Sequence, residues 1–312
     1  MPLLVRRLAG AELPPRLRDL PRPPEEMFVA GELPRALAVA IVGTRKASPE
    51  AMEFAGRLAG DLARQGVVVL SGGAVGIDTA AHTGALDAGG ATVVVAPSSI
   101  DRPYPPQNAP LFTRIVEQGG ALLSAYESDT PALPYRFFHR NTLLAALSHA
   151  LVVVETRHRG GARNAASAAR RLGRPVLAVP AAPWTKSGGG CILELKAGAR
   201  VAASAADILD VLEFPSSRRE DSEVSPALRP EQAGFDFRPV GQVVGQRAGE
   251  LDEEGNALVE LLRVGPLWPD EICQGLGLPA PRVQELILTL TLESVVVSEA
   301  SGRVILLSAQ IR

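Results

Sequence analysis

The chain has 312 residues, of which 46% are hydrophobic and 21% charged, and its net charge is −2. This length predicts two domains of a globular protein, and no apolar run is long enough to cross a membrane. Because residues 1–15 carry charges and prolines where a signal peptide has its apolar stretch, we expect a cytoplasmic protein with no membrane partner. Two cysteines and four histidines without ligand spacing predict neither a disulfide scaffold nor a metal site, and we expect no cofactor.

Residues 1–36 are rich in proline and arginine and have no periodicity, which predicts an irregular N-terminal lead-in. From residue 37 onward, short apolar runs alternate with helical stretches. The runs lie at 36–43, 67–70, 91–97, 121–126, 150–155 and 175–180, and the helices at about 49–65, 77–88, 108–118, 138–148 and 162–172. Continuous apolar runs are typical of strands buried on both faces of a parallel sheet. Residues 37–214 are therefore predicted to form a doubly wound α/β domain.

The segment 215–254 is polar and aperiodic, which predicts a linker. In residues 255–312, three helical stretches precede a hairpin around Ser301 and Gly302, the order of a small winged-helix domain. Residues 250–312 carry 10 acidic and 4 basic side chains, and the third helix offers only Arg282. Since DNA affinity comes largely from neutralised phosphates, we predict a protein-interaction or regulatory module rather than a reader of duplex DNA.

Two glycine-bearing segments follow predicted strands of the α/β domain. Gly43, Thr44 and Arg45 follow the first strand, and Ser71, Gly72 and Gly73 follow the second, directly before a helix. Ligands of open α/β sheets bind beyond the carboxyl ends of the strands, where backbone N–H groups and a helix N-terminus favour an anion. Both segments are candidate phosphate-binding loops, although glycines that only cap and pack the helix would give the second pattern equally well. Asp78 and His82, four residues apart, are interpreted as structural rather than as an acid–base pair.

Basic side chains concentrate in residues 136–174, with eight arginines against Glu155 alone. Arg136, Phe137 and Arg140 begin this stretch, and the combination of cations with aromatic rings suits single-stranded nucleic acid. Phe138 is expected to belong to a core. A later loop places Arg157, Arg159 and Arg163 around Gly160 and Gly161, which makes it a further candidate for anion binding.

The chain resembles the DNA-processing protein A family (DprA, also called Smf). The resemblance covers roughly residues 27–212 and rests on the order of IVGTR, SGGAVGIDTAAH, YPPQN, FFHRN, LVVVE and GRPVLAVP. It implies an extended Rossmann-like, mainly parallel sheet and a homodimer that binds single-stranded DNA. It also implies that the protein protects incoming strands and loads RecA recombinase where single-strand-binding protein coats them, during natural transformation and recombination. The DNA contacts that it implies are Arg45, Ser71, Gly72, Phe137, Arg140 and Asn141.

The chain departs from the family pattern at Val75 and Thr142, where arginine is usual. Arg159, Arg163 and Lys186 are the candidates to compensate. The alternative hypothesis is a nucleotide-binding protein or a phosphoribohydrolase of nucleoside monophosphates on a related fold. Such enzymes resemble this chain in their glycine-rich loops, but their PGGxGTxxE segment, with its catalytic carboxylate, corresponds here to RGGARNAA. A binding protein without catalysis is therefore the leading prediction.

Overall fold

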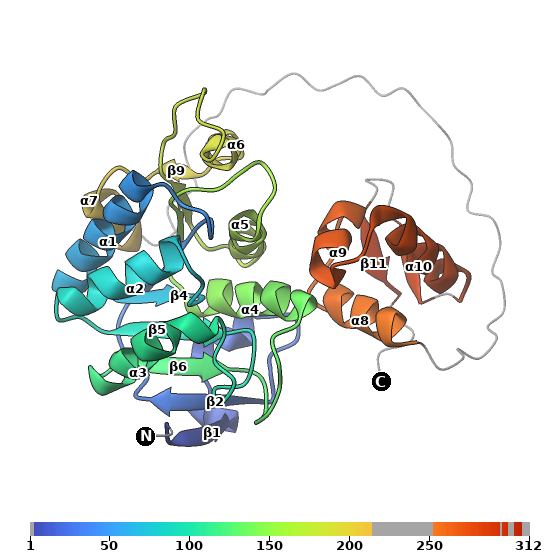
Figure 1. Ribbon diagram of the computed structural model, residues 1–312, viewed down its shortest axis with the longest axis horizontal. Coiled ribbons are helices and arrows are strands. Elements are labelled where there is room, and N and C mark those ends of the chain that lie inside the picture. Colours follow the sequence, from blue (N-terminus) through green and yellow to red (C-terminus); the bar gives the residue numbers. More distant parts are fainter. Residues whose placement is uncertain (1–2, 214–251, 294, 299–302, 308–312) are drawn as a thin grey trace.

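The computed structural model describes residues 3–213, 252–293, 295–298 and 303–307 (Figure 1). Its first domain is built on a nine-stranded sheet in the order β1-β2-β6-β5-β4-β3-β7-β8-β9. The strands are β1 (Val5–Ala9), β2 (Glu26–Gly31), β3 (Ala38–Val42), β4 (Val68–Ser71), β5 (Thr92–Ala96), β6 (Ala121–Ser124), β7 (Ala150–Val153), β8 (Val176–Ala178) and β9 (Arg200–Val201). In the sheet, each neighbouring pair along β6-β5-β4-β3-β7-β8-β9 is parallel, whereas β2 is antiparallel to both β1 and β6.

Helices cover both faces of this sheet (Figure 1). The helices are α1 (Pro49–Arg64), α2 (Ile77–Asp87), α3 (Ala109–Glu117), α4 (Pro134–Leu147), α5 (Gly161–Arg171), α6 (Gly189–Lys196) and α7 (Ala205–Glu213). Successive side chains of a strand alternate between faces, so Val39 and Ile41 of β3 pack with α1, α2 and α7. Ala40 and Val42 pack on the opposite side with α4 and α5. The predicted doubly wound, mainly parallel architecture is confirmed.

The N-terminal part differs from the irregular lead-in expected over residues 1–36. Its described residues form β1 and β2, which extend the sheet beyond β6, and two short 3-10 turns at Gly10–Glu12 and Pro15–Asp19. Only Leu8 of β1 is buried, because this strand lies at the sheet edge. An exposed antiparallel edge strand tolerates charged residues such as Arg6 and Arg7, so it lacks the continuous apolar run that marks the central strands.

The C-terminal domain contains α8 (Glu253–Leu262), α9 (Pro269–Leu276), α10 (Ala280–Leu292) and the antiparallel pair β10 (Val296–Ser298) and β11 (Val304–Leu306). This order is compatible with the predicted winged helix. Helix α8 starts at Glu253, two residues inside the predicted linker 215–254; most of that linker and the turn at Ser301 and Gly302 lie outside the described residues. Of the helices that the structure describes, none is long and apolar enough to cross a bilayer.

Candidate functional site

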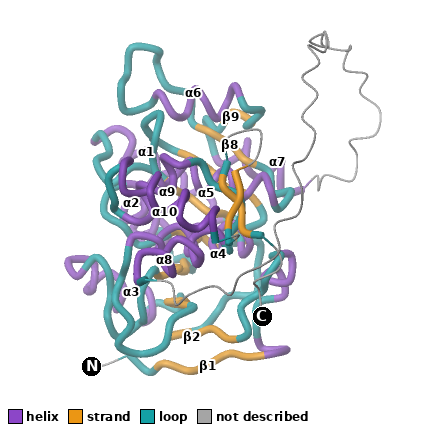
Figure 2. The backbone as a smooth tube through the Cα atoms, turned by 90° about the vertical axis from the view of Figure 1, so that its right-hand side faces the viewer, coloured by secondary structure: helices purple, strands orange, loops and turns teal. Residues whose placement is uncertain are grey.

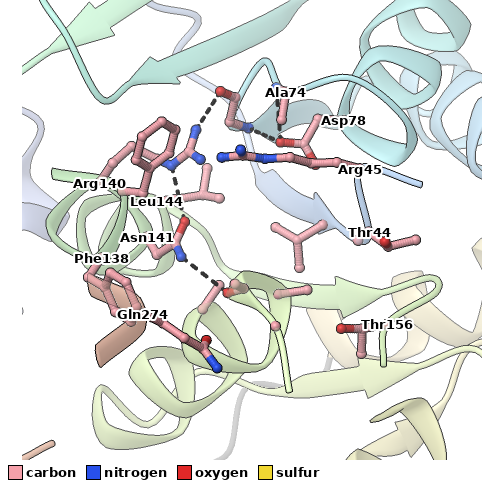
Figure 3. Close-up of a pocket in the computed structure, with 18 of the residues that line it drawn as sticks. Thr44, Arg45, Ala74, Asp78, Phe138, Arg140, Asn141, Leu144, Thr156 and Gln274 are labelled. Carbon is pink, nitrogen blue, oxygen red and sulfur yellow. Dashed lines mark hydrogen bonds between the residues drawn. The ribbon is translucent and has the colours of Figure 1, made fainter. Parts of the chain in front are cut away.

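The strand order reverses at β3, which pairs with β4 on one side and β7 on the other. Such a switch point is where open α/β sheets bind ligands, because neighbouring loops diverge there. A cavity of about 590 Å³ opens at this position between the loops that follow β3, β4 and β7 and the first turns of α4 (Figure 3). The residues predicted for binding that line it are Gly43, Thr44, Arg45, Gly72, Phe137, Arg140, Asn141, Arg159 and Gly161.

Arg45 provides an exposed cation of the cavity. Its guanidinium carbon lies 4.8 Å from the ring centre of Phe137, and Tyr104 meets the same ring edge-on at 5.4 Å between centroids. The loop that carries Arg45 is held on both sides, since the Thr44 N–H donates to the Glu155 carbonyl (2.7 Å) and the Thr44 carbonyl accepts from Ile77 N–H (3.4 Å). A cation stacked on a ring is thus presented at the opening of the cavity on a fixed loop.

The β4 loop forms the floor of the cavity. Its N–H groups at Gly72 and Ala74 donate to the Asp78 carboxylate, at 3.1 and 3.3 Å. Burial raises the pKa of Asp78, while Arg140 and these N–H donors act in the opposite direction. Asp78 therefore holds the loop in its conformation, which agrees with the structural interpretation of this residue.

Arg140 is 5% exposed and lies beside the β4 loop (Figure 3). Its Nη1 donates to the carbonyls of Gly72 and Val95, and its Nε to Asn141 Oδ1 (3.1 Å). Burial lowers the pKa of Arg140 to about 10, so the side chain stays charged at neutral pH. A Cβ added at Gly72 would collide with this guanidinium, which accounts for the glycine. Arg140 borders the cavity, yet its hydrogen bonds join β4, β5 and α4.

Asn141 and Ser71 also act within the fold. The Asn141 side-chain amide donates to the Gly161 carbonyl (3.1 Å) and to Asn164 Oδ1 (3.3 Å), which ties α4 to the start of α5. The Ser71 hydroxyl is fully buried and donates to the Ile41 carbonyl at 2.6 Å. Ser71 does not line the cavity, nor do four other residues predicted for binding: Gly73, Arg136, Arg163 and Lys186.

Most arginines of the 136–174 stretch are engaged inside the protein. Arg163 and Arg170 both bind the carboxylate of Glu194, which is 1% exposed. Arg174 pairs with Asp19, and Arg136 lies 4.9 Å over the ring of Tyr126. Besides Arg140, the members of this stretch that line the cavity are Arg157 and Arg159, both exposed. The cationic rim therefore consists of Arg45, Arg157 and Arg159.

His82 is fully buried, and its Nδ1 lies 2.7 Å from the Thr92 hydroxyl. Because that hydroxyl donates to the Val69 carbonyl, it accepts from His82, which places the proton on Nδ1. Burial lowers the pKa of His82 to about 3, so the ring is neutral near pH 7 and serves packing, as the sequence suggested. Within residues 3–213 and the described part of the C-terminal domain, no group of three or more His, Cys, Asp or Glu side chains could hold a metal ion.

Three contributors to this region were missed from the sequence. Tyr104 lines the cavity, and so does Gln274 of α9, more than a hundred residues away in the chain. Asp270 of the same helix pairs with Arg159 (2.9 Å). YPPQN could have indicated Tyr104, but no local pattern marks Asp270 or Gln274, because their position depends on how the two domains pack.

Comparisons with known proteins show which family and fold the chain shares. The family model described as DNA recombination-mediator protein A matches residues 6–213. A DNA-processing protein DprA of Mycobacterium tuberculosis is 39% identical over 233 residues, which cover 74% of this chain and 59% of the relative; the chain thus spans little more than half of that relative.

Two solved structures are similar over about two thirds of the chain. The crystal structure of DNA processing protein A from Streptococcus pneumoniae is 30% identical with a TM-score of 0.63, covering 67% of this chain and 75% of the other. DNA processing protein A from Helicobacter pylori, whose structure was described for its mode of binding single-stranded DNA, is 28% identical with a TM-score of 0.61. That match covers 68% of this chain and 96% of the other.

Proposed function

The chain belongs to the DNA recombination-mediator protein A family, and on that basis we propose that its β3–β4–β7 cavity binds single-stranded DNA. The observation that carries the proposal is the exposed Arg45 guanidinium stacked on Phe137 above a floor of glycine-bearing backbone. Such a site combines a cation for a phosphate with a ring on which a base stacks, and stacking is available only to unpaired bases. The single-stranded DNA of the Helicobacter pylori protein supports the same class of ligand.

The phosphate contacts of this proposal belong to Arg45, Arg157 and Arg159, which are the exposed arginines of the cavity. Gly160 is the N-cap of α5 and Gly161 is its first residue, so the DNA backbone approaches a helix N-terminus there without a side chain in the way. Arg140 and Asn141 hold the surrounding loops and helices in place through their hydrogen bonds. Arg136, Arg163, Gly73 and Ser71 act in the surrounding fold, and Lys186 lies beyond the cavity, so these residues hold or extend the site rather than fill it.

The test is fluorescence anisotropy of a labelled oligonucleotide, single-stranded and duplex, at several salt concentrations. We expect preference for the single strand and a slope of log affinity against log salt near −0.7 for each phosphate neutralised. Arg45→Ala removes one charged donor worth about 1.5–3 kcal/mol, hence weakens binding at least tenfold. Arg57→Ala is the matched control, because Arg57 is an exposed arginine of α1 paired only with Glu53 among the described ion pairs. If Arg45→Ala, Arg57→Ala and the unmodified chain all bound the single strand with equal affinity, the cavity would be rejected as the DNA-binding site.

We extend the proposal to the partners that the family resemblance implies. The protein would act as a homodimer that protects incoming single strands and transfers them to RecA recombinase in the presence of single-strand-binding protein. Its support is family membership, not a surface on this chain. The measurement is RecA strand exchange on strands coated with single-strand-binding protein. Acceleration by the unmodified chain and its loss in Arg45→Ala would support transfer.

The enzymatic alternative needs a carboxylate that reaches a bound nucleotide. Asp78 is the carboxylate among the described residues that line the cavity; it is 6% exposed and accepts two backbone N–H groups. We therefore propose binding without catalysis. Release of free adenine from adenosine monophosphate by the purified protein would reverse this choice.

A further inference from the structure

The C-terminal domain lies against α4 of the first domain (Figures 1 and 2), and residues of the first turns of α4 line the cavity. Its α8 and α9 contact α4, and Phe138 of α4 is buried within the C-terminal core beside Leu261 and Ile272. The fit is close: a Cβ added at Gly275 of α9 would lie 3.2 Å from the Phe138 ring. Phe138 is a core residue, as predicted, but it anchors the other domain. The helix that frames the cavity is thus also the docking site for the C-terminal domain.

Polar contacts continue this interface into the cavity. Asp270 at the start of α9 pairs with Arg159 at 2.9 Å, and Gln274, one turn later, lines the cavity wall (Figure 3). Glu271 of the same turn acts on Arg171 and opposes the lowering of its pKa by burial. A helix face with carboxylates thus faces arginines of the 136–174 stretch, one of which belongs to the cationic rim.

The C-terminal domain carries a net negative charge and therefore repels a polyanion such as DNA. Residues 250–312 carry 10 acidic and 4 basic side chains. The arginine of α10, Arg282, is already surrounded by Asp252, Glu254 and Glu285. When DNA phosphates enter the cavity, they compete with Asp270 for Arg159 and meet a net negative surface.

We propose that α9 of the C-terminal domain is an internal competitor of single-stranded DNA, which occupies part of the cavity mouth and must leave before a strand binds fully. This inference rests on the proposed DNA-binding function. The Arg159–Asp270 pair is exposed on both sides (73% and 57%), so it contributes little to docking, and the apolar contacts of Tyr135 and Phe138 provide most of it.

Two variants of the full chain test the competition through affinity. Asp270→Asn removes the carboxylate from Arg159 and should strengthen binding of a single-stranded oligonucleotide about two- to fivefold. Glu285→Gln makes the same change of charge on α10 and should have no comparable effect. Tyr135→Ala removes an apolar docking contact outside the cavity lining and should also strengthen binding. Weaker binding by Tyr135→Ala would mean that this ring stacks on DNA instead, and would overturn the proposal.

Amide hydrogen exchange gives a readout that does not depend on affinity. On addition of single-stranded DNA, amides of α9 should exchange faster while those of residues 156–161 become protected. Protection of both regions would show that α9 stays in place on DNA, which contradicts competition. The outcomes separate the two proposals: no DNA binding by the unmodified chain and by Asp270→Asn alike rejects the DNA-binding function. Equal binding by both rejects only the competition.

A second inference concerns Trp184, whose residue surface is 85% exposed. It lies in the loop after β8, the strand next to β7, whose loop forms one wall of the cavity. The first turn of α6, which follows this loop, is fixed to that wall, since Gly190 N–H donates to the Thr156 carbonyl at 2.7 Å. A Cβ added at Gly189 would lie 2.6 Å from the His158 ring, so these loops are in close contact. Lys186, also exposed, stands two residues from the indole.

We infer that Trp184 and Lys186 extend the DNA track beyond the cavity, the indole as a stacking platform and the ammonium as a phosphate contact. The chain has two tryptophans, so Trp268→Phe leaves Trp184 as the sole indole fluorophore. Single-stranded DNA should quench this emission, and duplex should not. Trp184→Ala should lower affinity for long oligonucleotides several-fold and leave short ones, which fill only the cavity, unchanged. Unquenched emission while anisotropy reports binding would overturn this inference without affecting the DNA-binding function.

Discussion

Replacement of Arg140 by methionine distinguishes a structural arginine from a DNA contact. Methionine keeps much of the length of the side chain but removes its charge and its donors to the Gly72 and Val95 carbonyls. Both carbonyls and the Asp78 carboxylate would then lose the cation that faces them. Loss of one partner from a buried, hydrogen-bonded charge costs about 3–5 kcal/mol. Domains are stable by about 5–15 kcal/mol, so Arg140→Met should lose a large part of the free energy of unfolding.

The assay is urea unfolding followed by circular dichroism, with Arg45→Ala as the reference. With a denaturant slope of about 2–3 kcal/mol/M, the Arg140→Met midpoint should fall by about 1–2 M, whereas the exposed Arg45 should leave it nearly unchanged. DNA affinity should fall in both variants, for different reasons. An unchanged midpoint together with lost affinity in Arg140→Met would refute the structural role and return Arg140 to the list of direct contacts.

Gly72→Ala should destabilise the domain by a similar amount, since the added Cβ collides with the Arg140 guanidinium. In the double variant Gly72→Ala, Arg140→Met, the loss of unfolding free energy measured with urea should be well below the sum of the two single losses. His82→Gln should flatten the pH dependence of stability. Because burial lowers the folded-state pKa of His82 to about 3 from 6.5, the unfolded chain binds the proton first, and stability falls as pH drops from 6.5 toward 3. Between pH 7 and pH 4.5 this group costs the unmodified chain about 2–3 kcal/mol, and an equal loss in His82→Gln would contradict that assignment.

The central strands were predictable because nearly all of their side chains are apolar and buried. Runs such as Val93–Val95 and Leu151–Val153 are buried on both faces, so apolar character alone marks them. The edge strand β1 was missed since its arginines face solvent, and α6 was missed because three glycines open it. The apolar pattern that predicts an element is weak where the element is only partly buried, and also where glycine backbone packs in place of side chains.

The candidate site was predictable as a place but less so as a set of contacts. Parallel strands bring their carboxyl-end loops together, which is why Thr44, Arg45 and Gly161 meet as expected. Whether a polar side chain faces the cavity or the interior depends on tertiary packing, and in this structure the side chains of Ser71 and Arg140 are buried and bind backbone carbonyls. The excess of arginine over 136–174 was similarly ambiguous, because acidic partners such as Glu194 come from elsewhere in the chain.

The reversal of strand order at β3 has a consequence for fragments of this protein. The β3 and β4 loops come from the first part of the chain, and the β7 loop, with Arg157 and Arg159, comes from beyond residue 149. A proteolytic cut between β6 and β7 would therefore leave neither piece with a whole cavity. Degradation intermediates would not sequester DNA, whereas two complementary pieces that reassociate through the β3–β7 pairing would regain the site together with the sheet.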